Sequence, residues 1–596
     1  MIMTTESKIR AALAALTLTV LSLAQPLHAG DDAVAELHAL FDEEWERTLR
    51  ESPETATYLG DGRYNDRWDD ISPDAIERRH ASDRAVLARL LRIDRKALPP
   101  AEQLNHDLFR RQYERRIEGH AHAQFLIPLN QRGGVQTADE ILEVLRFDNA
   151  EAYEHWLARL RALPKLIDQN ITLMRMGIEE QRLHPKVVMQ RIPAQIEKQI
   201  VDDPQQSPFY APFAGFPDGV PEAERRRYAK QARRVIEREI VPAYRRLLAF
   251  FVDDYLPACP EDVGAWKQPN GAAFYDWAVR RYTTTSLTAE QIHEIGLAEV
   301  QRIRAGMEAI REQVGFDGDL KAFFEHLRSD PQFYYASGDE LLTAYRALSK
   351  RVDPELPRLF GRIPRLPYGV RPIPDNIAPD TTTAYYLPGA ADGTRAGWYY
   401  VNLYKPETRP KYEMEALTLH ESVPGHHFQI ALAQELGELP QFRKNGWGMT
   451  AFVEGWGLYA ESLGEELGLY QDPYSKFGAL TYEMWRAVRL VVDTGMHHKR
   501  WTRQQAIDFF MANAAKSELD IVNEIDRYIA WPGQALAYKI GQLKIRELRT
   551  RAQTGLGERF DLRAFHDRVL GNGAIPLDVL EQDIDAWIAA VQAPSE

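Results

Sequence analysis

The sequence predicts a mainly α-helical protein, a large two-lobed helical body with a deep cleft and a small β-hairpin or sheet. Apolar residues recur at steps of three and four along most of the 596 residues, the period of helices with one buried face. Runs typical of strands occur only within residues 383–403. With 44% hydrophobic residues, the chain can bury a large core. A Pro-Asn-Gly segment near residue 270 separates an expected N-terminal helical lobe, residues 30–270, from a second lobe, residues 271–596.

The first 29 residues have the composition of a secretory signal peptide. Lys8 and Arg10 precede an apolar run, residues 11–24, that is short for a membrane span, and small residues offer cleavage after Ala24 or Ala29. We therefore expect a protein secreted across the inner membrane into the periplasm. No cysteine lies near these positions to carry a lipid anchor, and no later stretch is long and apolar enough for stable membrane insertion.

The net charge restricts the expected binding partners, and the single cysteine restricts how the fold can be stabilised. A net charge of −14 argues against nucleic acid or an anionic membrane as a partner. Cys259 has no second cysteine to pair with, so we expect an exported protein that is stable without disulfides. The sequence leaves the oligomeric state open.

Helical patterns dominate the N-terminal lobe and return after the boundary. Ser52 and Pro53 predict an N-cap followed by proline in the first turn of a helix. Thr288 and Gln291 have the spacing of a capping box that opens a long helix, and residues 576–591 predict an amphipathic helix. The first predicted helix carries an apolar stripe of Val34, Leu37, Phe41, Trp45 and Leu49.

The clearest strand signal lies in residues 383–387 and 397–403, which are rich in aromatic and β-branched residues. A Gly-rich loop joins them, which predicts a β-hairpin, whereas the Pro-rich residues 362–380 indicate an irregular connection. An edge strand beside a catalytic site can bind an extended peptide through main-chain hydrogen bonds, so Tyr400 and Asn402 are candidate substrate-binding residues. The alternative is a hairpin that only packs against the helices.

Residues suited to a catalytic metal site follow the hairpin. His420 and Glu421 are adjacent, His426 and His427 come soon after, and Glu454 lies on a later helical segment. Two imidazoles and one carboxylate can bind Zn²⁺ and leave a fourth position for water, whose proton a neighbouring Glu can accept. We expect His420, a second His and Glu454 to be metal ligands and Glu421 to be the general base.

The spacing between the histidines differs from that of His-Glu-x-x-His. On a regular helix, a six-residue step from His420 turns His426 away by about 240°, and a seven-residue step places His427 about 10.5 Å further along the axis. Pro424 and Gly425 lie between them and favour a local bulge. If these two residues are looped out, His426 takes the position of the second ligand, and we therefore favour His426 over His427.

Two comparisons within the chain sharpen this prediction. His293 and Glu294 form another His-Glu pair, but no second His follows nearby, so that pair is expected to be structural. Glu461 follows Glu454 by seven residues and lies on the same helix face. It can orient a ligand by hydrogen bonding, and the alternative is that it faces solvent.

Motifs in this order resemble a bacterial family catalogued as domain of unknown function 885, over nearly the whole mature chain. That family is similar to helical zinc peptidases of the thimet oligopeptidase, angiotensin-converting enzyme and carboxypeptidase Taq kind. The motifs are His-Glu-x-x-Pro-Gly-His at residues 420–426, Glu-Gly-Trp-Gly-Leu-Tyr-Ala-Glu at 454–461, Val-Val-Asp-Thr-Gly-Met-His at 491–497 and Trp-Pro-Gly-Gln-Ala-Leu-Ala-Tyr-Lys-Ile-Gly-Gln at 531–542.

The resemblance implies an exported zinc metallopeptidase that hydrolyses short peptides. In thimet-type enzymes the third ligand is the Glu of a Phe-Val-Glu segment, which Glu454 and its two predecessors match. Related peptidases stabilise the oxyanion with a His and a Tyr, which implies catalytic roles for His497 and Tyr538. The Pro-Gly insertion departs from their motif. The alternatives are a zinc hydrolase of a non-peptide amide or ester and a non-catalytic peptide-binding module.

Overall fold

The structure is a computed structural model that describes residues 29–593, except for 376–377, 381, 391–392, 438 and 446–448. The predicted signal peptide therefore lies outside the described residues, apart from Ala29, where the first described helix begins. None of the described helices has the length and apolar character needed to cross a membrane.

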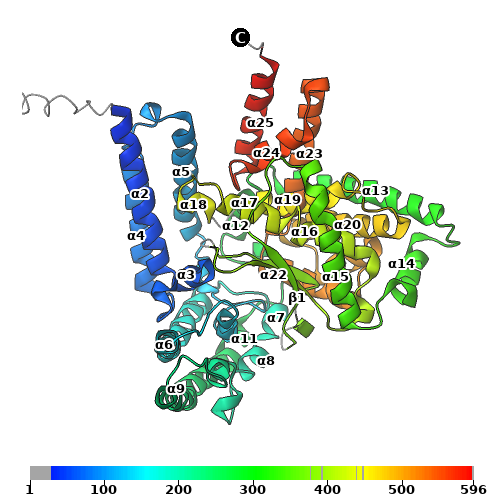
Figure 1. Ribbon diagram of the computed structural model, residues 1–596. Helices are drawn as coiled ribbons and strands as arrows, with labels where there is room; N and C mark the ends of the chain where they lie inside the picture. The colour runs from blue at the N-terminus through cyan, green and yellow to red at the C-terminus, as the bar shows by residue number, and fades with distance from the viewer. Residues whose placement is uncertain are drawn as a thin grey trace, which may run out of the picture.

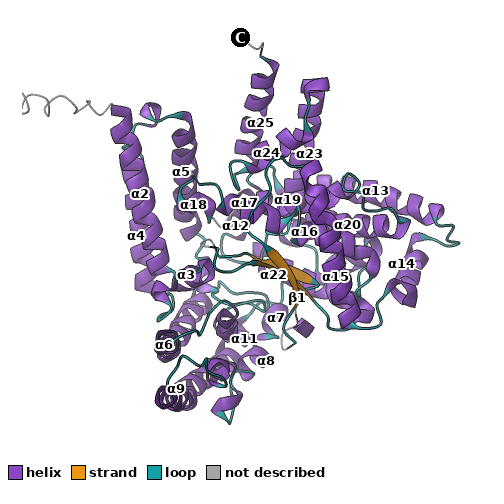
Figure 2. Cartoon of the chain, viewed as in Figure 1, coloured by secondary structure: helices purple, strands orange, loops and turns teal. Residues whose placement is uncertain are grey.

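The protein is mainly α-helical with one small sheet, as predicted, and Figure 2 shows the sheet surrounded by helices. Two π-helical segments, Ile236–Ile240 and Phe251–Tyr255, link α9, α10 and α11 into one continuous rod. The N-terminal α-helices are α2 (Ala29–Glu51), α3 (Pro53–Leu59), α4 (Pro73–Leu90), α5 (Pro100–His120), α6 (Ala150–Glu179), α7 (Lys186–Met189), α8 (Ile192–Glu197), α9 (Glu222–Val235), α10 (Val241–Phe250) and α11 (Leu256–Ala258).

The second half begins with long helices and then passes through the sheet to the helices of the metal motif. Its α-helices are α12 (Gly271–Thr283), α13 (Ala289–Gln313), α14 (Leu320–Ser329), α15 (Gly338–Val352), α16 (Met414–Glu421), α17 (His426–Gln434), α18 (Gln441–Lys444), α19 (Thr450–Glu461), α20 (Pro473–His497), α21 (Arg503–Asn513), α22 (Glu518–Ala530), α23 (Leu536–Leu556), α24 (Leu562–Leu570) and α25 (Leu577–Gln592).

Local sequence signals explain where several helices begin. Pro53 occupies the first turn of α3, directly after Ser52. Thr288 and Gln291 form the predicted capping box at the start of α13, each side chain bonding to the other's backbone N–H. On α2, Leu37 and Phe41 of the predicted apolar stripe are almost fully buried. These elements form as the sequence predicts because their signals are local.

The sheet confirms the predicted hairpin and adds a strand that the sequence analysis missed. β2 (Ala384–Leu387) pairs antiparallel with β3 (Gly397–Val401), and β1 (Tyr368–Pro372) pairs parallel with the other side of β3. β1 lies in the Pro-rich segment that was expected to be irregular. Strand β3 is therefore the centre of the sheet, in the order β1–β3–β2.

The helices of the metal motif lie in the middle of the molecule. In Figure 1, α16, α17 and α19 have α2, α4 and α5 on one side and α13, α14 and α20 on the other. Their apolar faces, including Leu419, Phe428 and Trp456, belong to one buried cluster with α15 and α23–α25. A second cluster joins Tyr244 of the N-terminal half to Val488 of α20, so the core continues across residue 270. The division into two lobes stays a prediction.

Candidate metal centre

The chain breaks its helix between His420 and His426, as the Pro-Gly pair predicts. Helix α16 ends at Glu421, and α17 begins at His426. A Cβ on Gly425 would lie 1.9 Å from the main-chain oxygen of His420, so only glycine fits there. The indole N–H of Trp456 on α19 donates a hydrogen bond to the carbonyl oxygen of Pro424 at 2.7 Å. The break is thus fixed by its own sequence and by α19.

This break brings three potential ligand atoms together. The Nε2 atoms of His420 and His426 lie 3.5 and 3.4 Å from Oε2 of Glu454. One donor atom from each of the three side chains lies within 4.8 Å of the other two. His420 is buried, and the side chains of His426 and Glu454 are only 11% and 19% exposed. The three residues predicted as ligands therefore converge from α16, α17 and α19.

The arrangement fits a tetrahedral cation. With metal–ligand bonds of about 2.0–2.1 Å, neighbouring ligand atoms in a tetrahedral zinc site lie about 3.3–3.4 Å apart. The two nitrogen–oxygen distances here agree with that spacing. Oε2 of Glu454 is buried and accepts no hydrogen bond from the described part of the chain. An acceptor left in this state is costly unless a cation or a proton compensates it.

Residues behind the cluster fix the orientation of His420. Its Nδ1 lies 2.8 Å from Oε1 of Glu461, so Glu461 faces the site and not solvent. Arg486 of α20 lies 3.4 Å from the same carboxylate oxygen. A Cβ on Gly457 would lie 2.8–3.0 Å from atoms of the His420 ring, so glycine lets this imidazole lie against α19. Of the two alternatives predicted for Glu461, the structure supports the one in which it orients a ligand, whereas no sequence pattern predicts the contacts of Gly457 and Trp456.

Charge within the cluster is balanced in the absence of a metal. Burial lowers the pKa of His420, but the carboxylates of Glu454 and Glu461 outweigh it and raise this pKa to about 9. Burial raises the pKa of Glu454, yet the nearby imidazoles of His426 and His420, 3.4 and 3.5 Å from its carboxylate, hold it well below its usual value. A cation in this position would take over the role of the imidazole proton.

Glu421 follows His420 directly, but no hydrogen bond from a described residue fixes its side chain as Glu461 fixes that of His420. The residue is 9% exposed, and its carboxylate makes no hydrogen bond or ion pair with any described residue. Its negative charge contributes to the raised pKa of His420, so the two side chains are close. A carboxylate that is unpaired, near the cluster and partly shielded from solvent can exchange a proton with a bound water.

His427 points away from the cluster. Its Nδ1 lies 2.9 Å from the hydroxyl of Tyr386 on β2, and its ring packs against Tyr368 of β1 with the centroids 4.6 Å apart. Burial lowers the pKa of His427 to about 4. His427 therefore joins α17 to the sheet, and His426 is the histidine that faces Glu454.

The predicted oxyanion role of His497 is wrong. Its Nδ1 accepts a hydrogen bond from the main-chain N–H of Ala265 at 3.0 Å, and its Nε2 donates to the carbonyl oxygen of Tyr528 at 3.0 Å. Both ring nitrogens are thus used by buried backbone, which leaves no N–H for a substrate. Burial lowers the pKa of His497 to about 4, so the ring is neutral. His497 therefore joins the α11–α12 connection and α22 to the end of α20.

Tyr538 lies on α23, and its predicted role at the cluster stays a prediction. Burial and then the negative charge of Glu454 raise the pKa of its phenol. The guanidinium of Arg489 lies over its ring at 4.2 Å. The hydroxyl therefore keeps its proton at neutral pH and can donate a hydrogen bond.

The predicted substrate strand is also wrong, because β3 has neighbours on both sides. Tyr400 is 2% exposed and stacks on Tyr385 with the ring centroids 4.6 Å apart. Asn402 is buried, and its amide donates to the carbonyl oxygens of Ala378 and Thr382. Both residues stabilise the sheet and its adjoining loop.

A cavity of about 560 Å³ adjoins the cluster. His426 and Glu454 line it, together with Tyr386, Leu387 and the following residues at the end of edge strand β2. Ile430 and Val453 supply apolar walls, and Tyr58 closes the cavity from the N-terminal half. The cluster is therefore open to a molecule of the size of a short peptide.

Comparison with known protein families identifies the family to which this chain belongs. A family model described as a bacterial protein of unknown function (DUF885) matches residues 53–584. The chain belongs to this family. A search of curated proteins found no match. This family assignment confirms the family resemblance seen in the motifs, and it carries no activity with it.

Two solved structures share the fold. One is described as the "putative lipoprotein from Colwellia psychrerythraea"; it is 28% identical, covers 95% of this chain and 100% of its own, and has a TM-score of 0.88. The other, a "putative lipoprotein of unknown function from Shewanella oneidensis", is 18% identical, covers 91% of this chain and 98% of its own, and has a TM-score of 0.68. The family fold therefore extends over nearly the whole chain.

Replacing Glu461 by Gln tests the orientation of His420. The neutral amide keeps the shape of the side chain but loses the charge that holds the Nδ1 proton, so we expect about 10–100-fold weaker metal affinity. The affinity is measured by competition with a chelator. Glu558→Gln, a change at an exposed glutamate of this DUF885 protein, is the control. Equal affinities for both variants would show that Glu461 does not orient the ligand.

The pH dependence of stability tests the structural role of His497. Its folded-state pKa of about 4 lies below the unfolded value of about 6.5, so the unfolded chain binds a proton that the folded chain does not, and stability falls as the pH drops from 6.5 to 4. In His497→Gln the slope of unfolding free energy against pH should be smaller by about one proton in this window. Denaturant unfolding at a series of pH values measures it, with His155→Gln as the control.

Proposed function

We propose that this protein is a zinc-dependent metallopeptidase that hydrolyses short peptides. The observation that carries the proposal is the convergence of His420, His426 and Glu454 at tetrahedral spacing beside the free carboxylate of Glu421. The donor set of two imidazoles and one carboxylate is that of catalytic rather than structural zinc, because it leaves one position open. The motif similarity to helical zinc peptidases supports the same reaction class.

The residues around the cluster have separate roles in this proposal. Bound zinc lowers the pKa of a coordinated water and polarises a carbonyl group. Glu421 accepts the proton of the attacking water and later donates it to the leaving amine. Tyr538 donates a hydrogen bond to the developing oxyanion, a role that its raised pKa favours.

The cavity beside the cluster favours an extended peptide as the substrate. Strand β2 is an edge strand, and its end lines the cavity together with His426 and Glu454. Its main chain can pair with a peptide laid along the cavity, which transfers to β2 the role first predicted for β3. The apolar walls favour peptide side chains over a highly charged small molecule.

We also propose that the protein is exported. Lys8, Arg10 and the apolar residues 11–24 have the pattern of a signal peptide. The two similar solved structures are both described as putative lipoproteins, a class of exported proteins. Determination of the N-terminus of the protein purified from periplasmic extract tests this proposal, and an intact N-terminus in the cytoplasm would contradict it.

Metal analysis and a peptide library together test the activity. We expect one zinc per chain by elemental analysis and cleavage of short peptides detected by mass spectrometry. Cleavage of amide or ester probes but not of peptides would favour a different zinc hydrolase. Peptide binding without cleavage, at full zinc occupancy, would favour a binding module, and a protein without metal affinity would contradict the proposal.

A further inference from the structure

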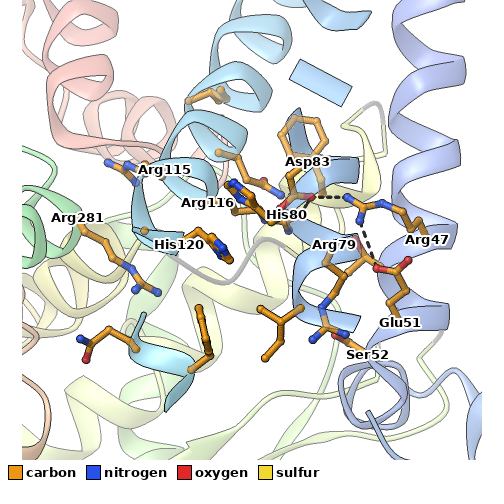
Figure 3. A pocket seen from close by; sticks show the side chains of 18 of the residues that line it. Arg47, Glu51, Ser52, Arg79, His80, Asp83, Arg115, Arg116, His120 and Arg281 are labelled. Atoms are coloured by element: carbon orange, nitrogen blue, oxygen red, sulfur yellow. Dashed lines mark hydrogen bonds and ion pairs between the residues drawn. The ribbon is translucent and has the colours of Figure 1, made fainter. Parts of the chain in front are cut away.

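A second cavity, of about 520 Å³, continues from the one that His426 and Glu454 line. Arg443, Met449 and Ala574 line both cavities, so the two adjoin each other, and together they are called the groove below. The walls of the second cavity come mainly from α2, α4, α5 and α12 (Figure 3). The groove thus extends from the metal cluster to helices near the beginning of the chain.

The far end of the groove is positively charged, although the whole chain has a net charge of −14. The side chains that line it include six arginines and only two carboxylates, Glu51 and Asp83. Figure 3 shows Arg115 and Arg281 on one side and Arg47 and Arg79 across from them. The arginines are Arg47, Arg79, Arg115, Arg116, Arg281 and Arg443.

The two carboxylates neutralise only one part of the cavity. Arg47 lies 2.6 Å from Asp83 and 3.2 Å from Glu51, whereas Arg116 is 3.8 Å from the same Asp83. Arg79 donates to the main-chain oxygen of Asp70, a neutral partner. Glu44 also lies 2.6 Å from Arg47, so the nearby carboxylates compensate Arg47 and Arg116. The remaining arginines, Arg79, Arg115, Arg281 and Arg443, form no ion pair with any described residue.

Arg115 and Arg281 make no hydrogen bond or ion pair with any residue in the described part of the chain. The guanidinium of Arg281 lies over the rings of Trp277 and Tyr282, at 5.0 and 5.2 Å. Burial lowers the pKa of Arg115 to about 10; the positive charges of Arg111 and Arg281 act in the same direction, and the carboxylates of Asp578 and Glu118 oppose them. An anion placed between Arg115 and Arg281 would relieve this repulsion.

Arg443 marks the junction of the two cavities and is 6% exposed. Its guanidinium donates to the side-chain oxygen of Asn105 at 2.5 Å and to the main-chain oxygen of Asn572, both neutral acceptors. Its Nε atom is buried without a hydrogen-bond partner among the described residues. A buried cation without a carboxylate partner is costly, and an anionic ligand in the groove would lower that cost.

We infer that the arginine-lined cavity binds a carboxylate of the peptide whose scissile bond lies at the metal cluster. The inference rests on the proposed function for the position of the substrate. Guanidinium groups bind carboxylates through two parallel hydrogen bonds, and Arg115 and Arg281 have these donors free. The α-carboxylate at the C-terminus of a peptide and the side chain of Asp or Glu offer the same chemistry.

Binding to the Glu421→Gln variant tests the inference without turnover. The probes are fluorescently labelled octapeptides of one sequence in three forms: a free C-terminal acid, a C-terminal amide, and the amide with one Gln changed to Glu. We expect at least one acidic form to bind about tenfold or more tightly than the neutral amide, by fluorescence anisotropy. The form that binds most tightly identifies the source of the carboxylate.

Two double variants in the same background locate the effect. Arg115→Gln with Arg281→Gln should abolish the preference for an acidic peptide. Arg233→Gln with Arg234→Gln, two exposed positions on α9, should leave it unchanged. Equal binding of the three peptides, or a preference that persists in the first double variant, would overturn the inference.

The same experiments distinguish failure of the inference from failure of the peptidase proposal. If no peptide binds, both the inference and the peptidase proposal are contradicted. If the acidic preference is present and depends on Arg115 and Arg281, but the wild-type protein cleaves no peptide, carboxylate binding by the arginine-lined cavity holds and the peptidase proposal is rejected. Loss of the preference at high salt would further support an ionic contact.

Discussion

The Glu421→Gln variant is expected to bind zinc like the wild-type protein and to lose about 10²–10⁴-fold in peptide turnover. The carboxylate is unpaired among the described side chains and adjacent to His420, so its removal takes away the proton acceptor but none of the three converging ligand atoms. Elemental analysis measures the metal content, and mass spectrometry of a peptide digest measures turnover.

Glu415→Gln is the matched control, because Glu415 lies on the same helix but is ion-paired with Arg351. It should retain both zinc and activity. Full activity in Glu421→Gln would place the general base elsewhere. Loss of zinc together with activity would make Glu421 part of the metal site and would contradict the roles proposed here.

His426→Ala is expected to lose metal affinity by more than the 10–100-fold that removal of an outer partner costs, whereas His427→Ala should keep it. The Nε2 atom of His426 lies 3.4 Å from the Glu454 carboxylate, while His427 bonds to Tyr386. Both residues are histidines and they are adjacent in the chain. A difference in metal affinity between the two variants therefore reflects the direction in which each side chain points and not the residue type.

Chelator competition measures the affinity of both variants, and thermal unfolding of the metal-free proteins measures their stability. His427→Ala should be less stable by roughly 1–3 kcal/mol, because it loses a buried hydrogen bond and its packing against Tyr368. The opposite result, with zinc lost in His427→Ala and kept in His426→Ala, would reverse the assignment of the second ligand.

Much of the fold and of the candidate site could be predicted because their signals are local. The capping box at Thr288 and the apolar stripe of α2 depend on residues within a few turns. Pro424 and Gly425 break the helix wherever it packs, and this break alone favours His426. The seven-residue spacing placed Glu461 on the helix face of Glu454 but left open whether it orients a ligand or faces solvent, and the structure places it against His420.

The errors arose where distant segments decide the environment of a residue. Strand β1 was missed because its pairing partner lies 29 positions later in the chain, as in the register of Tyr368 with Gly397, and its own proline content hides the strand. That pairing moved β3 from the edge to the centre, which removed Tyr400 and Asn402 from substrate binding. Backbone groups from Ala265 and Tyr528 gave His497 its structural role.

The helical class, the hairpin, the break at Pro424 and the residue types of the metal cluster could be predicted from the sequence, because helix period, capping and proline chemistry act over a few residues. Which side chains face each other depends on how the helices pack in the tertiary structure. The arginine-lined cavity collects residues from α2, α4, α5 and α12 with Arg443, and no spacing along the chain could predict that they share a space. Such contacts depend on the packing of complete helices, which is set by burial across the whole core.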